Sequence, residues 1–244
     1  MSIEPVGGKH GLRAFIEGRL SSHGANAPQY VAFRDRDFDV EPPDEVKLIP
    51  LAGKPIFLTH RACIESYLLD VGLMRTYWTA NAGSPGWRHG QPPKTDEIDG
   101  LLTTAAKEIS PYQAVRWALA SIKPGPRWPE VRTTWTDGSG DLPTSLDYES
   151  CLGEAEGLVG SSRANTDGVT VELLKERATA YKVRFEIDAF WGERRYLVWF
   201  HGKDLLRSMQ RKLPISLKHF CEWATGNVDW KDHEDLVELA GKVN

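Results

Sequence analysis

The spacing of hydrophobic positions predicts alternating strands and helices in the first third of the chain. An apolar run at residues 30–33 has no clean alternation, which is typical of a strand covered on both faces. Further short strands are predicted at residues 47–51 and 56–58, and helical spacing predicts helices over residues 10–23 and 61–70. This order of elements favours an α/β fold with a mostly parallel sheet flanked by helices.

The pattern becomes mainly helical after a Gly- and Pro-rich stretch at residues 83–94. Helices are predicted over residues 96–123 (interrupted or kinked near Pro111), 145–159, 170–179, 204–211 and 217–224, with another near the C-terminus. Residues 133–136 are a strand candidate, and residues 181–187 and 195–200 predict a β-hairpin around Gly192. We therefore divide the chain into a core at residues 1–82, a mainly helical insertion at 83–180, and a C-terminal hairpin with helices at 181–244 that completes the same domain.

Composition narrows the class of protein. Hydrophobic residues are 41% and charged residues 26% of the chain, which is ordinary for a globular protein and argues against gross disorder. The formal net charge of −4 means that any nucleic-acid binding must come from local patches. Three scattered cysteines argue against a disulfide framework or a zinc site and fit a reducing cytosol. Without a membrane-length apolar run or a signal peptide, we expect a cytoplasmic protein with no membrane contact.

Two aspartates directly follow the apolar run at residues 30–33. Asp35 and Asp37 are two residues apart where the chain leaves a strand, which is where ligands collect in α/β sheets. Carboxylates in this arrangement can converge on a hard cation such as Mg²⁺ or Mn²⁺. The same pattern also fits a simple acidic turn, because aspartate favours turns and caps.

Four short motifs occur in a fixed order along the chain. They are Gly7-Gly8-Lys9 before a helix, Asp35-Arg36-Asp37-Phe38 after a strand, Arg61-Ala62-Cys63-Ile64-Glu65-Ser66-Tyr67-Leu68-Leu69 in a helix, and His201-Gly202-Lys203-Asp204-Leu205-Leu206 near the end. Together they resemble the motifs of Toprim (topoisomerase–primase) domains, in the form found in the Toprim-like nucleases of bacterial anti-phage systems, such as the overcoming-lysogenization-defect type. The resemblance implies a Toprim-like fold over most of the chain.

The resemblance also implies roles for matching residues. Asp35, Asp37 and Glu65 would be the metal ligands, and Lys203 would stabilise charge on the scissile phosphate. The metal would activate water and neutralise the phosphate. Lys9 could contact phosphate at a helix N-terminus, but the absence of a full P-loop pattern disfavours this role. For Glu65 and Lys203, the alternative is a solvated charge on a helix.

The activity implied by the resemblance is Mg²⁺-dependent cleavage of DNA or RNA by an effector of phage defence. It also brings an ATPase partner protein and a homodimer into consideration. The alternative is a catalytically degenerate module that keeps the scaffold and binds a partner protein or nucleic acid. A primase or topoisomerase fragment is disfavoured, because the chain is short and offers no tyrosine or zinc context for it.

One part of the Toprim pattern has no clear counterpart. Toprim domains begin with a strand that ends in a catalytic glutamate, followed by a helix, a strand and a helix before the two aspartates. Only 17 residues separate Glu17 from Asp35, too few for those elements, and Glu17 lies in a helical pattern. We prefer an alignment that starts at the second strand, with Glu4 not expected to substitute. A missing strand would leave backbone groups unpaired, so we expect a start placed too far downstream, a gap filled by another segment or chain, or a degenerate domain.

The stretch 182–212 is locally basic. It holds eight Lys or Arg residues, namely Lys182, Arg184, Arg194, Arg195, Lys203, Arg207, Arg211 and Lys212. Only four acidic residues oppose them within the stretch. This excess fits contact with a phosphate backbone, and it equally fits solvated faces of strands and helices. No motif for sequence-specific base recognition is visible.

Overall fold

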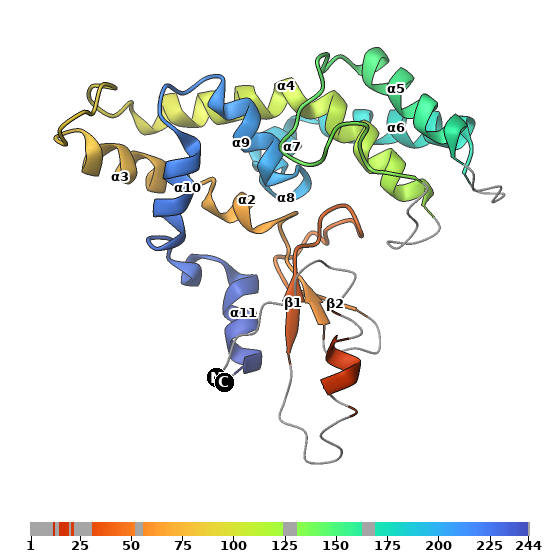
Figure 1. Cartoon of the computed structure of the whole chain (residues 1–244), viewed down its shortest axis with the longest axis horizontal. Helices are drawn as coiled ribbons and strands as arrows, with labels where there is room; N and C mark the ends of the chain where they lie inside the picture. The colour runs from red at the N-terminus through yellow and green to blue at the C-terminus, as the bar shows by residue number, and fades with distance from the viewer. Residues whose placement is uncertain are drawn as a thin grey trace. The chain divides into compact units, whose positions relative to one another are not determined.

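The computed structural model describes residues 12, 15–19, 21, 31–51, 56–123, 131–162 and 169–243. The chain divides into two compact units. Unit 1 comprises Met1–Arg36, Pro42–His60 and Asp229–Asn244, and unit 2 comprises Asp37–Glu41 and Arg61–Val228. The protein is therefore a mixed α/β chain in which the described strands all belong to unit 1 (Figure 1). The predicted division at residues 82 and 180 stays a prediction.

Unit 1 is built on a small mixed sheet. The strands β1 (Ala32–Arg34), β2 (Ile49–Pro50) and β3 (Ile56–Leu58) have the order β1-β3-β2. β1 pairs with β3 in parallel and β2 pairs with β3 antiparallel. In the described sheet β1 is an edge strand, so no described strand occupies the place beside it. The three predicted strands are confirmed. The sheet is mixed rather than mostly parallel, and Phe33 is 48% exposed, so β1 is not covered on both faces.

The C-terminal helix α11 (Glu234–Val243), which follows the short 3-10 turn η2 (Trp230–Asp232), is joined to the chain around the sheet by side-chain contacts. Its Asp235 carboxylate accepts a hydrogen bond from the backbone of His60 at 3.0 Å, and Glu238 accepts one from the backbone of Leu48 at 2.9 Å. The Lys242 ammonium lies 4.8 Å from the ring centre of Phe57. Residues far apart in sequence therefore complete one unit.

Unit 2 contains the described helices α2 to α10. Their bounds are α2 (Ile64–Leu68), α3 (Val71–Asn81), α4 (Thr95–Ile122), α5 (Tyr148–Ser161), α6 (Val171–Glu186), α7 (Asp188–Gly192), α8 (Tyr196–Trp199), α9 (Gly202–Gln210) and α10 (Leu217–Thr225). The long helix α4 packs against α3, α5, α6 and α9. Residues 112–119 of α4 are all buried, as expected for a helix enclosed by neighbours. α4 is continuous through Pro111, and the segment predicted as one helix at 61–70 ends at Leu68 before α3 begins.

The predicted hairpin at residues 181–200 is wrong. Residues 181–186 belong to α6, and α7 and α8 follow. The aromatic and β-branched residues that suggested strands instead extend a helical face of α6, on which Leu174, Ala178, Tyr181 and Phe185 are buried. Packing of this face against α4 outweighs local strand propensity. The strand candidate at residues 133–136 is also wrong, because these residues form bends beside α4.

Two earlier expectations concern the N-terminal region. Residues 12, 15–19 and 21 are helical, as predicted, and Glu17 is exposed on that helical segment. This agrees with rejecting Glu17 as the end of a strand. Glu4 and residues 7–9, including Lys9, lie outside the described residues.

None of the described helices combines the length and hydrophobicity needed to cross a bilayer.

Candidate functional site

Three of the four motifs contribute residues that meet in unit 2, the aspartate motif through Asp37 and Phe38 alone. The backbone N–H of Asp37 donates to the carbonyl of Ala62 at 2.7 Å, which joins the aspartate turn to the segment before α2. The N-terminus of α9 packs on the N-terminus of α2, and this contact is so close that only glycine fits at position 202. The fold therefore joins segments that are more than a hundred residues apart in sequence.

Asp37 adopts a backbone conformation uncommon for residues other than glycine. Its φ angle is 50°, in the left-handed region where aspartate is better tolerated than most side chains. Residues held in such conformations often occur at functional sites. The side chain is 29% exposed, and its Oδ1 lies 3.2 Å from Nε2 of His201.

His201 is a buried residue at the N-cap of α9. Burial opposes the charged ring, but contacts with Asp37 and Cys63 and the charge of Asp204 outweigh burial and raise the pKa of His201 to about 9. The backbone N–H of Lys203 lies 3.3 Å from Nδ1, a contact that would favour a neutral ring. A neutral ring with its proton on Nε2 makes both contacts, donating to Asp37 and accepting from Lys203, and the raised pKa favours a second proton on Nδ1.

Cys63 completes a row of three side chains. Its Sγ lies 3.6 Å from Nδ1 of His201 and accepts a hydrogen bond from the backbone N–H of Gly202 at 3.2 Å. The order cysteine, histidine, aspartate matches that of nucleophile, base and orienting group in thiol enzymes. Cys63 is fully buried, however, so the row holds three segments together and offers no exposed nucleophile.

Glu65 and Lys203 face each other across the α2–α9 contact. The Lys203 ammonium lies 3.5 Å from Oε1 of Glu65, and Lys203 is 49% exposed at its side chain. The second carboxylate oxygen of Glu65, Oε2, is buried and has no hydrogen-bond partner within the described residues. A buried, unpaired carboxylate oxygen is costly, so Oε2 is suited to contact a cation.

The predicted metal ligands fall in different units. Asp37 and Glu65 belong to unit 2, whereas Asp35 follows β1 in unit 1. Across the described part of the chain, no group of three or more His, Cys, Asp or Glu side chains is arranged to hold a metal ion. Asp37 and Glu65 are the two predicted ligands that unit 2 carries.

A buried ion pair joins α9 to α4. The Asp204 carboxylate forms an ion pair with Arg116 of α4 and accepts hydrogen bonds from Gln113 Nε2 and the backbone of Gly140, each at 2.7 Å. Gln113 also accepts from the backbone of His201 at 3.1 Å. Arg116 in turn donates to Ser139 Oγ at 2.9 Å. The network fixes α9, α4 and the loop 137–141 relative to one another.

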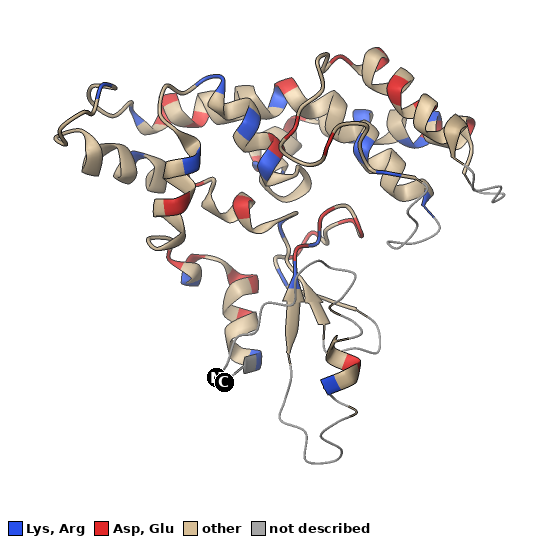
Figure 2. Cartoon of the chain, in the orientation of Figure 1, with Lys and Arg blue, Asp and Glu red and all other residues tan. Residues whose placement is uncertain are grey.

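In the folded chain, ion pairs with acidic residues neutralise most of the basic side chains of the stretch 182–212. Ion pairs join Lys182 to Glu186, Arg184 to Glu41, Arg194 to Asp99, Lys203 to Glu65, and both Arg211 and Lys212 to Glu108. Most of these carboxylates come from outside the stretch. Figure 2 accordingly shows acidic and basic residues interspersed along the helices of unit 2.

Sequence reasoning assigned no role to His201 or Cys63, although both lie inside the quoted motifs. The signal available was their position two residues before Glu65 and Lys203 in those motifs. None of the protein families, curated proteins or solved structures compared with this chain matches it.

Proposed function

We propose that this chain is a Toprim-like nuclease that uses Mg²⁺ or Mn²⁺ to cleave phosphodiester bonds of nucleic acid, as an effector of phage defence. The observation that supports this most is the meeting of Asp37, the α2 segment with Glu65, and the α9 segment with Lys203 in unit 2. Carboxylates and a lysine gathered from three distant segments are the groups that phosphodiester cleavage needs.

The carboxylates fit the proposed metal in chemical type. Mg²⁺ binds hard oxygen ligands through a few carboxylates, with water in its other positions. Of the predicted ligands, Glu65 through its Oε2 and Asp37 are the two that lie in unit 2, while Asp35 stays a candidate from the sequence. A bound metal would neutralise phosphate charge and activate water.

The chain's own residues then have separate tasks. Lys203 places an ammonium beside Glu65, where it can stabilise negative charge on the phosphate. His201 is a positioning residue, since its Nε2 fixes the direction of the Asp37 carboxylate. Gly202 lets α9 approach α2 closely enough to bring Lys203 and Glu65 together.

The test is cleavage of single- and double-stranded DNA and RNA by the purified chain, in Mg²⁺, Mn²⁺ or EDTA. Asp37→Asn, Glu65→Gln and Lys203→Gln should each slow metal-dependent cleavage by about 100-fold or more. The combined Asp35→Ala and Asp37→Ala variant should abolish cleavage. Glu176→Gln, which removes an exposed carboxylate of α6, is the charge-matched control and should cleave normally. Cleavage that survives in the double variant, or absence of cleavage by the wild type, would rule out the proposal.

The contact between His201 and Asp37 favours a second candidate, a binding module without catalysis. The His201 ring already contacts the Asp37 carboxylate, and its raised pKa favours a positive charge there, which reduces the need for a cation. This candidate predicts nucleic-acid or protein binding that is equal in Mg²⁺ and EDTA and unchanged in Asp37→Asn. Binding that requires Mg²⁺ and is lost in that variant would contradict it.

A further inference from the structure

An open hollow lies beside Glu65 and Lys203 in unit 2. Its volume is about 580 Å³, within the roughly 300–1,000 Å³ typical of small-ligand sites. The walls come from α9, α10 and the loop 137–141, and Leu206, Leu217 and Cys221 form its apolar part. The hollow is therefore large enough for one nucleotide-sized group and offers it apolar contact.

The loop wall of the hollow is held in place. The backbone of Gly140 donates to the buried Asp204 carboxylate, and Ser139 accepts from buried Arg116. Gly138 and Gly140 have φ angles of 147° and 93°, which other residues rarely adopt. At Gly140 a Cβ would also lie 3.3 Å from the Cβ of Lys203. A wall fixed before binding lowers the entropic cost of binding.

The polar groups of the hollow are of both signs. Glu65 is paired with Lys203, and Asp141 accepts a hydrogen bond from the backbone of its own loop. Of the remaining lining residues, Arg207 and Lys218 are exposed cations without an ion-pair partner in the part of the chain that the structure describes. Asp137 and Glu222 are exposed carboxylates that line the same space.

This combination matches the chemistry of a nucleotide. Arg207 and Lys218 suit an anionic phosphate, the leucines suit the flat face of a base, and carboxylates accept hydrogen bonds from the amino groups of bases. The base edges are free to reach such carboxylates in single strands, where they are not engaged in pairing. Resting on the proposed function, we propose that the hollow binds one unpaired nucleotide of a single-stranded substrate, next to the phosphate that is cleaved.

The experiment measures binding without cleavage. The full chain is titrated in EDTA against a fluorescent single-stranded oligonucleotide and against a duplex of the same sequence. The single strand should bind more tightly. Arg207→Gln should weaken its binding by about tenfold, and the dependence of log K on log salt should fall by about 0.7. Lys218→Gln should act in the same direction. Arg211→Gln is the matched control, because it makes the same change in the same segment outside the hollow, and it should change affinity less than twofold.

Competition separates a nucleotide site from a site for any anion. A nucleoside monophosphate should displace the oligonucleotide, and ribose 5-phosphate should do so at least tenfold less well. The inference is overturned if duplex and single strand bind alike, if Arg207→Gln and Arg211→Gln weaken binding equally, or if both competitors are equally effective.

The inference and the proposed function can fail separately. A wild type that binds single strands through Arg207 but cleaves none with any metal would retain the site and refute the nuclease. If the wild type cleaves and Arg207→Gln cleaves with the same KM, the proposed nuclease stands and the nucleotide site is refuted.

Discussion

Gly202 of α9 touches Ser66 of α2 so closely that a Cβ at position 202 would lie 2.5 Å from the Ser66 backbone nitrogen and 2.7 Å from its Oγ. Real Cβ atoms essentially never approach other atoms so closely. Since the 2.5 Å contact is with backbone, no side-chain rotation relieves it. The placement of Lys203 beside Glu65 depends on this absence of a side chain.

Replacing Gly202 with alanine should therefore destabilise unit 2. We expect a loss of about 1–3 kcal/mol in the free energy of unfolding, because α9 must move away from α2. Urea denaturation followed by tryptophan fluorescence measures it. The control is Gly153→Ala on α5, where a Cβ meets nothing within 4 Å, and which should gain about 0.5–1 kcal/mol from helix propensity. Equal changes in the two variants would contradict the close contact.

The helices could largely be predicted from the sequence, and the tertiary contacts of the site could not. α4, α5 and α10 have apolar spacing and end signals that act locally, so their existence follows from pattern alone. Residues 181–186 carry strand-like side chains, and their helical state depends on the face that α6 buries against α4. Local propensity contains no information about that partner.

The same limit applies to the candidate site. Spacing placed Asp35 beside Asp37, and the resemblance added Glu65 and Lys203. Contacts of His201 with Asp37 and Cys63 span 164 and 138 residues, distances over which a single sequence gives no pairing signal. Asp204, an apparently ordinary helix charge, is buried against Arg116 for the same reason.

Substitutions at the buried pair Arg116 and Asp204 should have large and non-additive effects on the free energy of unfolding. Arg116→Met leaves a buried aspartate charge without its cation and should cost about 3–5 kcal/mol. Adding Asp204→Asn removes that charge, so the double variant should be more stable than the sum of the single changes predicts, by about 0.5–3 kcal/mol. Urea unfolding of all four proteins completes the cycle. The exposed pair Lys182–Glu186 serves as control, with an expected coupling of about 0.3–0.5 kcal/mol. Additive effects at Arg116 and Asp204 would mean that the pair is not formed.

We expect the ionised Glu41 carboxylate to stabilise unit 2 in a pH-dependent way. Burial raises its pKa, but hydrogen bonds from Tyr181 at 2.6 Å and Arg184 at 2.7 Å outweigh burial, so the pKa lies below its usual value of 4.5. A carboxyl with a lowered folded-state pKa stabilises the fold above pH 4.5, and this contribution is lost as the pH falls through the lowered value. Glu41→Gln should therefore be less stable than the wild type at pH 7, by about 0.2–1 kcal/mol since the pair is half exposed. The difference should shrink toward pH 3 in urea titrations. A difference that is constant from pH 7 to pH 3, as expected for Glu176→Gln, would exclude the ionised pair as its cause.

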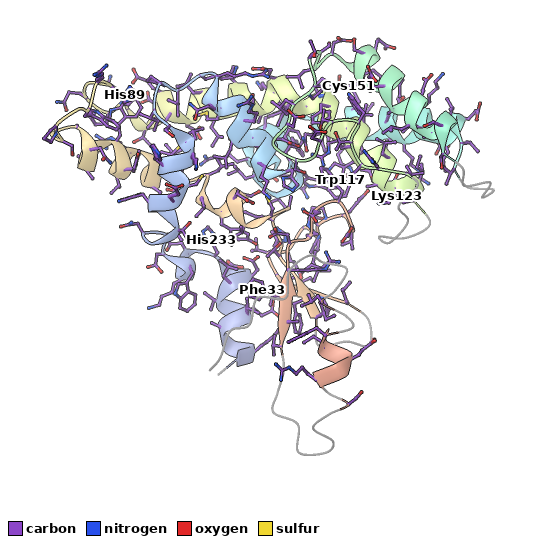
Figure 3. All side chains as sticks on the ribbon, in the orientation of Figure 1. Phe33, His89, Trp117, Lys123, Cys151 and His233 are labelled. Carbon is purple, nitrogen blue, oxygen red and sulfur yellow. The ribbon has the colours of Figure 1, made fainter. Side chains whose placement is uncertain are left out.

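The rate at which Cys63 is alkylated measures opening of the α2–α9 contact. Cys63 and Cys151 are both fully buried. Cys63 lies against the N-terminus of α9, and Cys151, which Figure 3 labels, lies on α5. Alkylation of a buried thiol requires opening of the structure that covers it. If Gly202→Ala loosens α9 locally, iodoacetamide should label Cys63 about tenfold or more faster than in the wild type, since about 1.4 kcal/mol corresponds to tenfold. The labelling rate of Cys151 should change much less. Peptide mapping by mass spectrometry gives both rates. The rate of each cysteine in the variant is compared with the rate of the same cysteine in the wild type, so the raised pKa of Cys151, about 12, does not affect the comparison. Equal acceleration of the two cysteines would instead mean that the whole unit opens together, and that the α9 segment has no independent stability.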